Sequence, residues 1–147
     1  MSGKVTNGEG VHASDVVKSC FAAWARGDVE GTLHHIDDDC VYTIHVPADV
    51  LSFGGVHEGK DAIANCFQDI REQFAFVQYA LENVREDGDI VRAQIVFSFT
   101  HRSSGEYFDG RCRHVTQVKG KKVVRIDEYH DVDMTRAFVE MVRRPRG

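Results

Sequence analysis

The second half of the chain predicts an antiparallel meander, and this constrains the fold more than any other feature. Short turn sequences separate four stretches that alternate or are rich in β-forming residues. The predicted strands cover residues 76–84, 90–101, 106–119 and 122–131, with turns at Asp87-Gly88-Asp89, Arg102 to Gly105 and Lys119-Gly120-Lys121. Because each turn is short, consecutive strands must pair as neighbours in one sheet.

Helices are predicted mainly before this meander. Apolar residues recur at helical spacing after Ser14, a good N-cap, and Asp28 is placed to cap a second helix. The predicted elements are a helix from Ser14 to Gly27, a short helix after Asp28, a strand over 40–46, an irregular loop over 48–58, and helices over 60–74 and 134–142. Helices, one strand, a helix and then a meander predict an α+β fold with helices on one face of the sheet.

The length of 147 residues is that of one domain. We expect a flexible lead-in over residues 1–12, a single domain over 13–142 and a basic tail over 143–147. No stretch approaches the ~20 apolar residues of a membrane span, and the N-terminus has no apolar segment of a secretion signal. No membrane partner is therefore expected.

The net charge and the cysteine content narrow the range of possible functions further. The formal net charge is −5, which argues against a nucleic-acid-binding protein. The four cysteines stand alone, without a C-x-x-C pair, so neither a zinc knuckle nor a redox motif is predicted. Free, buried thiols fit a reducing cytoplasmic compartment.

Strand alternation places ionisable side chains on an apolar sheet face. The face that carries Ile95, Phe97 and Phe99 is apolar throughout in its strand. In the next strand Cys112 shares its face with His114, Thr116 and Val118, and in the last strand Val124 and Ile126 share theirs with Glu128 and His130. We therefore expect one aromatic-lined face that also holds a carboxylate and two imidazoles.

Such groups suit acid–base chemistry. A buried carboxylate is costly unless it is paired, and burial raises its pKa toward the range of a general base. The structural alternatives are that Glu128 reaches solvent or an arginine and that His114 is a satisfied core histidine. The strand of His45 has no plainly polar face, so the pattern alone leaves the role of His45 open. His45, His114, Glu128 and His130 could form a facial metal site if they converged, but nothing in their spacing requires one, and no metal is predicted.

Three passages resemble the SnoaL-like and ketosteroid-isomerase-like families of the nuclear-transport-factor-2-like superfamily. They are residues 21–30 (FAAWARGDVE), residues 38–47 (DDCVYTIHVP) with 54–63 (GGVHEGKDAI), and residues 126–131 (IDEYHD). The resemblance implies a cone-shaped, curved, mostly antiparallel sheet packed against N-terminal helices, with an internal pocket. It is specific for the fold rather than for one activity.

The resemblance also implies site residues. Glu128 falls where limonene epoxide hydrolases keep the aspartate that activates water. His45 and Thr43 fall at the positions of the asparagine and tyrosine that hold this water in those enzymes. Ile95 and Phe97 replace the arginine and second aspartate of those enzymes, which argues against epoxide hydrolysis.

The resemblance to ketosteroid isomerases implies a second set of candidate catalytic positions. His45 lies near their base, His114 near their oxyanion-hole aspartate and Cys20 near their tyrosine. We therefore expect His45, His114 and Glu128 to be catalytic. The pocket-lining residues are expected to be Cys20, Trp24, Thr43, Ile95, Phe97, Phe99, Cys112, Ile126 and His130.

Three functions remain open. The first is a cofactor-free enzyme that moves a proton next to a carbonyl, as isomerases, dehydratases and the aldol-type SnoaL-like polyketide cyclases do. The second is a non-catalytic module for a small apolar or carbonyl-containing ligand. The third is a structural or assembly protein whose pocket is plugged by Phe97, Phe99 and Phe108.

The opposite sheet face predicts a homodimer, because the superfamily often dimerises there and its mixed polar side chains suit a polar interface. Those side chains are Arg92, Gln94, Ser98, Arg111, Arg113, Arg125 and Tyr129. Light scattering after size exclusion should give about twice the chain mass of 16.5 kDa. A single species at the chain mass would contradict the dimer.

Overall fold

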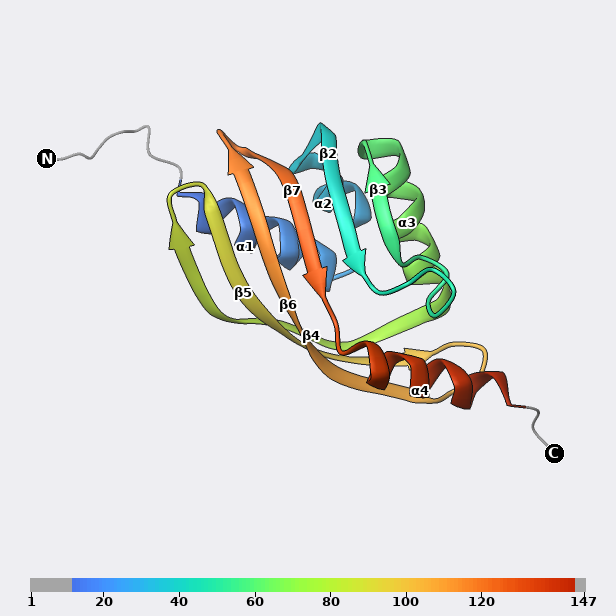
Figure 1. Cartoon of the computed structure of the whole chain (residues 1–147). Coiled ribbons are helices and arrows are strands. Elements are labelled where there is room, and N and C mark those ends of the chain that lie inside the picture. Colours follow the sequence, from blue (N-terminus) through green and yellow to red (C-terminus); the bar gives the residue numbers. More distant parts are fainter. Residues whose placement is uncertain (1–11, 145–147) are drawn as a thin grey trace, which may run out of the picture.

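A six-stranded sheet runs through the computed structural model, which describes residues 12–144, and helices α1, α2 and α3 cover one of its faces (Figure 1). Most of the expected lead-in and tail thus lies outside the described residues. The helices are α1 (Ala13–Ala25), α2 (Val29–His34), α3 (Lys60–Gln73) and α4 (Val132–Arg143). The strands are β2 (Ile36–His45), β3 (Gly55–Glu58), β4 (Phe74–Asp87), β5 (Ile90–His101), β6 (Tyr107–Lys119) and β7 (Lys122–Tyr129).

The strand order is β3-β2-β7-β6-β5-β4, so the meander of β4 to β7 is confirmed. Beyond it, β2 pairs in parallel with β7, and β3 pairs antiparallel with β2. The parallel pairing sets Tyr42 beside Ile126 and Ile44 beside Glu128. The first and last long strands of the chain therefore lie side by side.

Several boundaries differ from the sequence prediction, most of them by one to three residues, and three of the differences have a visible cause. The segment expected to be an irregular loop contains β3, whose four residues are too few to show a pattern. Strand β2 begins at Ile36 rather than Cys40, because Ile36 pairs with Val123 across an irregular step in the ladder. Helix α1 begins at Ala13, and its N-cap residue is His12, two residues before the predicted N-cap Ser14.

Two irregularities bend the long strand β4 and help the sheet to curve. The register between β4 and β5 shifts between Phe76 and Gln78 and again between Glu82 and Arg85. Asn83, inside the second shift, has φ of 53°. Bulges of this kind increase local bending and twist. In Figure 1 the long strands β4, β5 and β6 accordingly sweep past the ends of β2 and β7.

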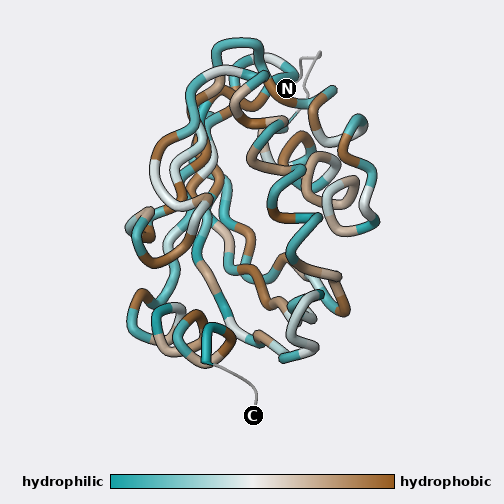
Figure 2. The backbone as a smooth tube through the Cα atoms, turned by 90° about the vertical axis from the view of Figure 1, so that its right-hand side faces the viewer, coloured by the Kyte–Doolittle hydropathy of each residue, from teal (hydrophilic) through white to brown (hydrophobic). Residues whose placement is uncertain are grey.

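Alternation along the strands separates a buried face from an exposed one, and the hydropathy colours alternate along the tube in Figure 2. The predicted apolar face of β5 is confirmed: Val91, Ala93, Ile95 and Phe97 are all buried. In β7 a register shift places Val123 inward where Val124 was predicted. All four cysteines are buried and free. No helix in residues 12–144 is long and apolar enough to cross a membrane.

Helix α4 packs across the far ends of the long strands (Figure 1). Asp131 caps it by accepting a hydrogen bond from the backbone N–H of Met134 at 3.1 Å. Its one buried aromatic side chain, Phe138, stacks on Phe108 with ring centroids 4.5 Å apart and lies 6.1 Å from the ring of Phe74. Phe138 therefore anchors α4 over the aromatic interior.

Removing this anchor should loosen α4 selectively. We expect Phe138→Ala to destabilise the protein by about 3–5 kcal/mol, the usual cost of removing a buried aromatic ring. Hydrogen exchange should rise first in residues 132–143. Met134→Ala, on the exposed side of the same helix, is the control and should change stability by less than about 0.5 kcal/mol. Equal effects of the two substitutions would contradict this packing.

Candidate active site

Glu128 lies inside the molecule because of its position in strand β7. Alternation puts it on the same inward face as Ile126. Its direct partner across the antiparallel ladder is His114 of β6, and its parallel neighbour is Ile44 of β2. His130 follows just beyond the strand end. Glu128 and His114 therefore approach each other as the alternation predicts, and His130 joins them.

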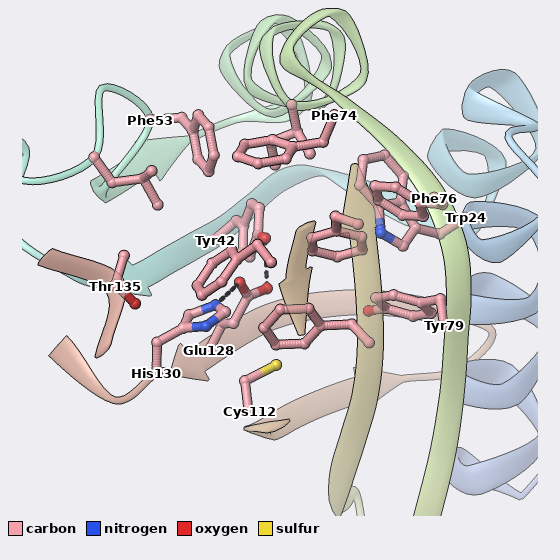
Figure 3. Close-up of a pocket in the computed structure, with 15 residues that line it drawn as sticks. Trp24, Tyr42, Phe53, Phe74, Phe76, Tyr79, Cys112, Glu128, His130 and Thr135 are labelled. Carbon is pink, nitrogen blue, oxygen red and sulfur yellow. Dashed lines mark hydrogen bonds and ion pairs between the residues drawn. The ribbon is translucent and has the colours of Figure 1, made fainter. Parts of the chain in front are cut away.

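Three side chains contact the Glu128 carboxylate, and two of these contacts are drawn in Figure 3. The hydroxyl of Tyr42 donates to Oε1 at 2.6 Å, and His130 Nε2 lies 2.5 Å from Oε2. His114 Nε2 lies 3.1 Å from Oε1. The Glu128 side chain is only 14% exposed, so these contacts replace most of the water it would otherwise bind.

His114 contacts the carboxylate in a different way from the other two. Its side chain is 4% exposed, and neither ring nitrogen makes a hydrogen bond of normal geometry despite the 3.1 Å approach. One face of the site is closed by Phe21, whose ring lies edge-on at 4.9 Å. His114 therefore lies against the carboxylate from the buried side of the site, with its Nε2 3.1 Å from Oε1.

Electrostatics keep the carboxylate ionised. Burial alone would raise the pKa of Glu128, but the adjacent rings of His130 and His114, through charge and hydrogen bonding, hold it well below its ordinary value. Burial, and secondly the charge of Glu128, raise the pKa of Tyr42 well above its ordinary value. The tyrosine thus stays a donor while the glutamate stays an acceptor.

The carboxylate forms part of the wall of an aromatic cavity of about 50 Å³ (Figure 3). A water molecule needs roughly 10–15 Å³ of such volume, so the space has room for about three to five waters or for a few heavy atoms of a ligand. The lining residues are Trp24, Tyr42, Leu51, Phe53, Ile70, Phe74, Phe76, Tyr79, Phe97, Phe99, Phe108, Cys112, Glu128, His130 and Thr135.

A second, smaller space of about 20 Å³ lies on the other side of the carboxylate. It is lined by Cys20, Phe21, Trp24, Thr32, Tyr42, Phe67, Tyr79, His114, Ile126 and Glu128. Trp24, Tyr42, Tyr79 and Glu128 border both spaces. His130 therefore faces the larger space and His114 the smaller one, with Glu128 between them.

The structure brings together most of the residues expected to line the pocket. Seven of them border one of the two spaces: Cys20, Trp24, Phe97, Phe99, Cys112, Ile126 and His130. Ile95 is fully buried but lies in the packed core rather than on either space. Whether Glu128 and His114 are catalytic stays a prediction.

His45 and Thr43 do not lie in the pocket, and their expected placement there is wrong. His45 Nε2 contacts Asp127 Oδ1 at 2.9 Å, and its ring stacks on Tyr129 at 4.1 Å, on the opposite face of the sheet. The reason is alternation in β2: Tyr42 and Ile44 are buried, so Thr43 and His45 must point away.

Sequence reasoning missed Tyr42 and Tyr79, the two tyrosines at this site. The signal for Tyr42 was present, because it shares a strand face with the apolar Ile44. Tyr79 was hidden, because the first bulge of β4 breaks the alternation just before it. Among the described residues its hydroxyl has no recorded hydrogen-bond partner. Burial, then the charges of Cys112 and Glu128, raise the pKa of Tyr79, so it stays protonated.

Comparisons with known proteins fit this architecture. The family model described as the SnoaL-like domain matches residues 17–126. No curated protein matches the chain.

Solved structures share the fold. A nuclear-transport-factor-2-like protein from Burkholderia xenovorans LB400 is 25% identical over 86% of this chain and 94% of that chain, with a TM-score of 0.71. One from Burkholderia thailandensis E264 is 22% identical over 92% and 100%, with a TM-score of 0.77. A protein with a ketosteroid-isomerase-like fold from Catenulispora acidiphila, in complex with trimethylamine, is 15% identical over 84% and 90%, with a TM-score of 0.71.

The Tyr42 hydrogen bond should contribute measurably to stability. We expect Tyr42→Phe to lower the free energy of unfolding by about 1–3 kcal/mol in urea, because a buried carboxylate loses a donor. Tyr129→Phe removes the hydroxyl of an exposed tyrosine on the other sheet face and should cost less than about 0.5 kcal/mol. Similar losses in both variants would refute a stabilising Tyr42–Glu128 bond.

Proposed function

This chain belongs to the SnoaL-like domain family, and from that premise we propose that it is an enzyme that moves a proton next to the carbonyl group of a small apolar molecule. Isomerisation, aldol-type cyclisation and dehydration all begin with such a step. The proposal needs no cofactor, because preorganised charges and donors in a dry cavity can stabilise the developing oxyanion.

One observation carries the proposal: an ionised carboxylate borders an otherwise aromatic cavity and is held by protein donors. Tyr42 binds one oxygen of Glu128 and His130 the other. Such contacts orient the group and keep it charged where water is scarce. A carboxylate in this setting can accept a proton from a carbon atom of a ligand in the cavity.

The roles follow from the positions of the side chains. Glu128 is the base: it takes the proton from the carbon beside the carbonyl, and the electrons of the C–H bond pass to the carbonyl oxygen. Tyr79, whose protonated hydroxyl borders the same cavity, is the donor to that oxygen. Glu128 then returns the proton to another carbon. His130 and His114 hold the carboxylate and balance its charge.

The cavity favours compact, flat ligands. Stacked rings form one wall, with centroids 4.3 Å apart for Phe76 and Phe99 and 4.6 Å apart for Phe97 and Phe99. A volume of about 50 Å³ accommodates only a few heavy atoms without movement of the lining side chains. Larger ligands require displacement of α4, which lies against the cavity through Thr135.

Isotope exchange tests the proton transfer without knowledge of the natural substrate. The protein is incubated in D₂O with a panel of small cyclic ketones and enones, and NMR follows loss of the hydrogen next to the carbonyl. We expect exchange with at least one compound, and Glu128→Gln should slow it by about 10²-fold or more.

Asp127→Asn provides the matched control. Asp127 is the adjacent carboxylate, and it also contacts a histidine, but on the outer sheet face. This variant should exchange at the wild-type rate. Binding of the panel compounds without proton exchange would favour a non-catalytic binding module. If the protein neither binds the compounds nor exchanges their protons, a structural protein with a filled pocket would be favoured. Exchange that survives Glu128→Gln would remove Glu128 as the base.

A further inference from the structure

Four residues of types that commonly bind metal ions lie close together on the inner face of two adjacent strands. Strand β6 carries Cys112 and His114 two residues apart, and Glu128 of β7 is followed at the same spacing by His130, just beyond the strand end. Alternation points Cys112, His114 and Glu128 inward, the ladder sets His114 opposite Glu128, and His130 borders the same cavity as Cys112 and Glu128. Cys112 consequently lies next to His130. We propose that Cys112, Glu128 and His130 bind a divalent transition-metal ion of the zinc class.

The distances suit such a site. One donor atom each from Cys112, Glu128 and His130 lie within 4.8 Å of one another. Tetrahedral zinc, with bonds of about 2.3 Å to sulfur and about 2.0 Å to nitrogen and oxygen, places its donors roughly 3.3–3.6 Å apart. Side-chain movements that shift the donor atoms by about 1 Å therefore suffice to bring them to zinc-binding distances. Figure 3 shows Cys112, Glu128 and His130 lining the same pocket.

The donor set selects the metal. A thiolate, an imidazole and a carboxylate form a borderline-soft set that suits zinc or cobalt, whereas magnesium and calcium prefer oxygen ligands alone. The charges also balance: one dication offsets one thiolate and one carboxylate. A neutral complex can be buried in aromatic surroundings at far lower cost than an unpaired charge.

The cavity leaves a coordination position open. All three side chains border the same space of about 50 Å³, which has room for a water molecule or a ligand oxygen on the ion. Three protein ligands with one open position are typical of catalytic rather than structural zinc sites. His114, at 3.1 Å from the other oxygen of Glu128, is placed to orient the carboxylate from behind.

The site goes beyond the proposed function and does not depend on it. On coordination the thiol proton and the proton between Glu128 and His130 leave to solvent, and the metal takes their place. The metal then occupies the base, so bound zinc should suppress proton exchange. The metal-loaded cavity would instead offer a Lewis acid to a ligand oxygen.

Metal titration of the full-length, chelator-treated protein tests the inference. Competition with a chromophoric chelator measures zinc affinity, and cobalt serves as the spectroscopic probe. We expect one tight site per chain and a near-ultraviolet thiolate-to-cobalt band. Cys112→Ser and His130→Asn should each weaken binding by at least the roughly 10–100-fold that outer-shell changes cost.

Matched variants control for general damage. Cys40→Ser removes another buried thiol, which borders neither space, and His45→Asn removes a histidine that also pairs with a carboxylate. Both should bind zinc like the wild type, and circular dichroism checks the fold of every variant. If the site variants fail to fold, the cobalt band of the wild-type protein still decides.

Two results would overturn the site. One is the absence of tight zinc binding by the wild-type protein. The other is zinc binding that lacks the thiolate band and is unchanged in Cys112→Ser, which would place the ion elsewhere, for example on the exposed His34 and the half-buried His35. Proton exchange by the metal-free protein is measured separately, so loss of either proposal leaves the other open to its own result.

Discussion

A carboxylate buried among aromatic rings must be surrounded by donors or positive charge, and the arrangement around Glu128 reflects this constraint. Leaving such a charge unpaired costs several kcal/mol, comparable to the whole stability of a small domain. The topology supplies the partners. Parallel pairing of β2 with β7 sets the strand of Tyr42 beside that of Glu128, and antiparallel pairing with β6 brings His114. The chain then leaves the sheet through His130 and enters α4.

The same side-chain chemistry occurs on both faces of β7 with different consequences. On the outer face, His45 pairs with Asp127 where the histidine side chain is 38% exposed and Arg125 adds a second contact. On the inner face, Glu128 and His130 are 14% and 11% exposed and border an aromatic cavity. The Asp127 side chain is itself only 11% exposed, so the two pairs differ in the exposure of the histidine and in the aromatic cavity that borders the inner one. A bordering cavity and a buried histidine, rather than residue type, therefore distinguish the candidate site from the outer contact.

The predictable parts of this fold are those set by local periodicity. The alternation of β5, the capping of α2 by Asp28 and the meander all follow from short stretches of sequence, and the structure confirms them. The inward placement of His114 and Glu128 follows in the same way. The long-range parallel pairing of β2 with β7 leaves no local signal.

The errors arose where position in a family outweighed alternation or where a bulge interrupted it. His45 was expected in the pocket from the resemblance, although the apolar Ile44 beside it requires the opposite face. Val124 was predicted to point inward, but the register shift in β7 gives that place to Val123. A bulge changes the face of every residue beyond it, and no sequence pattern here marks its position.

The charge of Glu128 is the central claim, and infrared difference spectroscopy tests it most directly. The spectrum of the wild-type protein minus that of Glu128→Gln at neutral pH isolates the bands of this one side chain. We expect the antisymmetric stretch of an ionised carboxylate, with no carbonyl stretch of a protonated acid. A protonated carbonyl band would show instead that Glu128 is neutral in its cavity, and the base, its donors and the charge balance described above would all have to be reassigned.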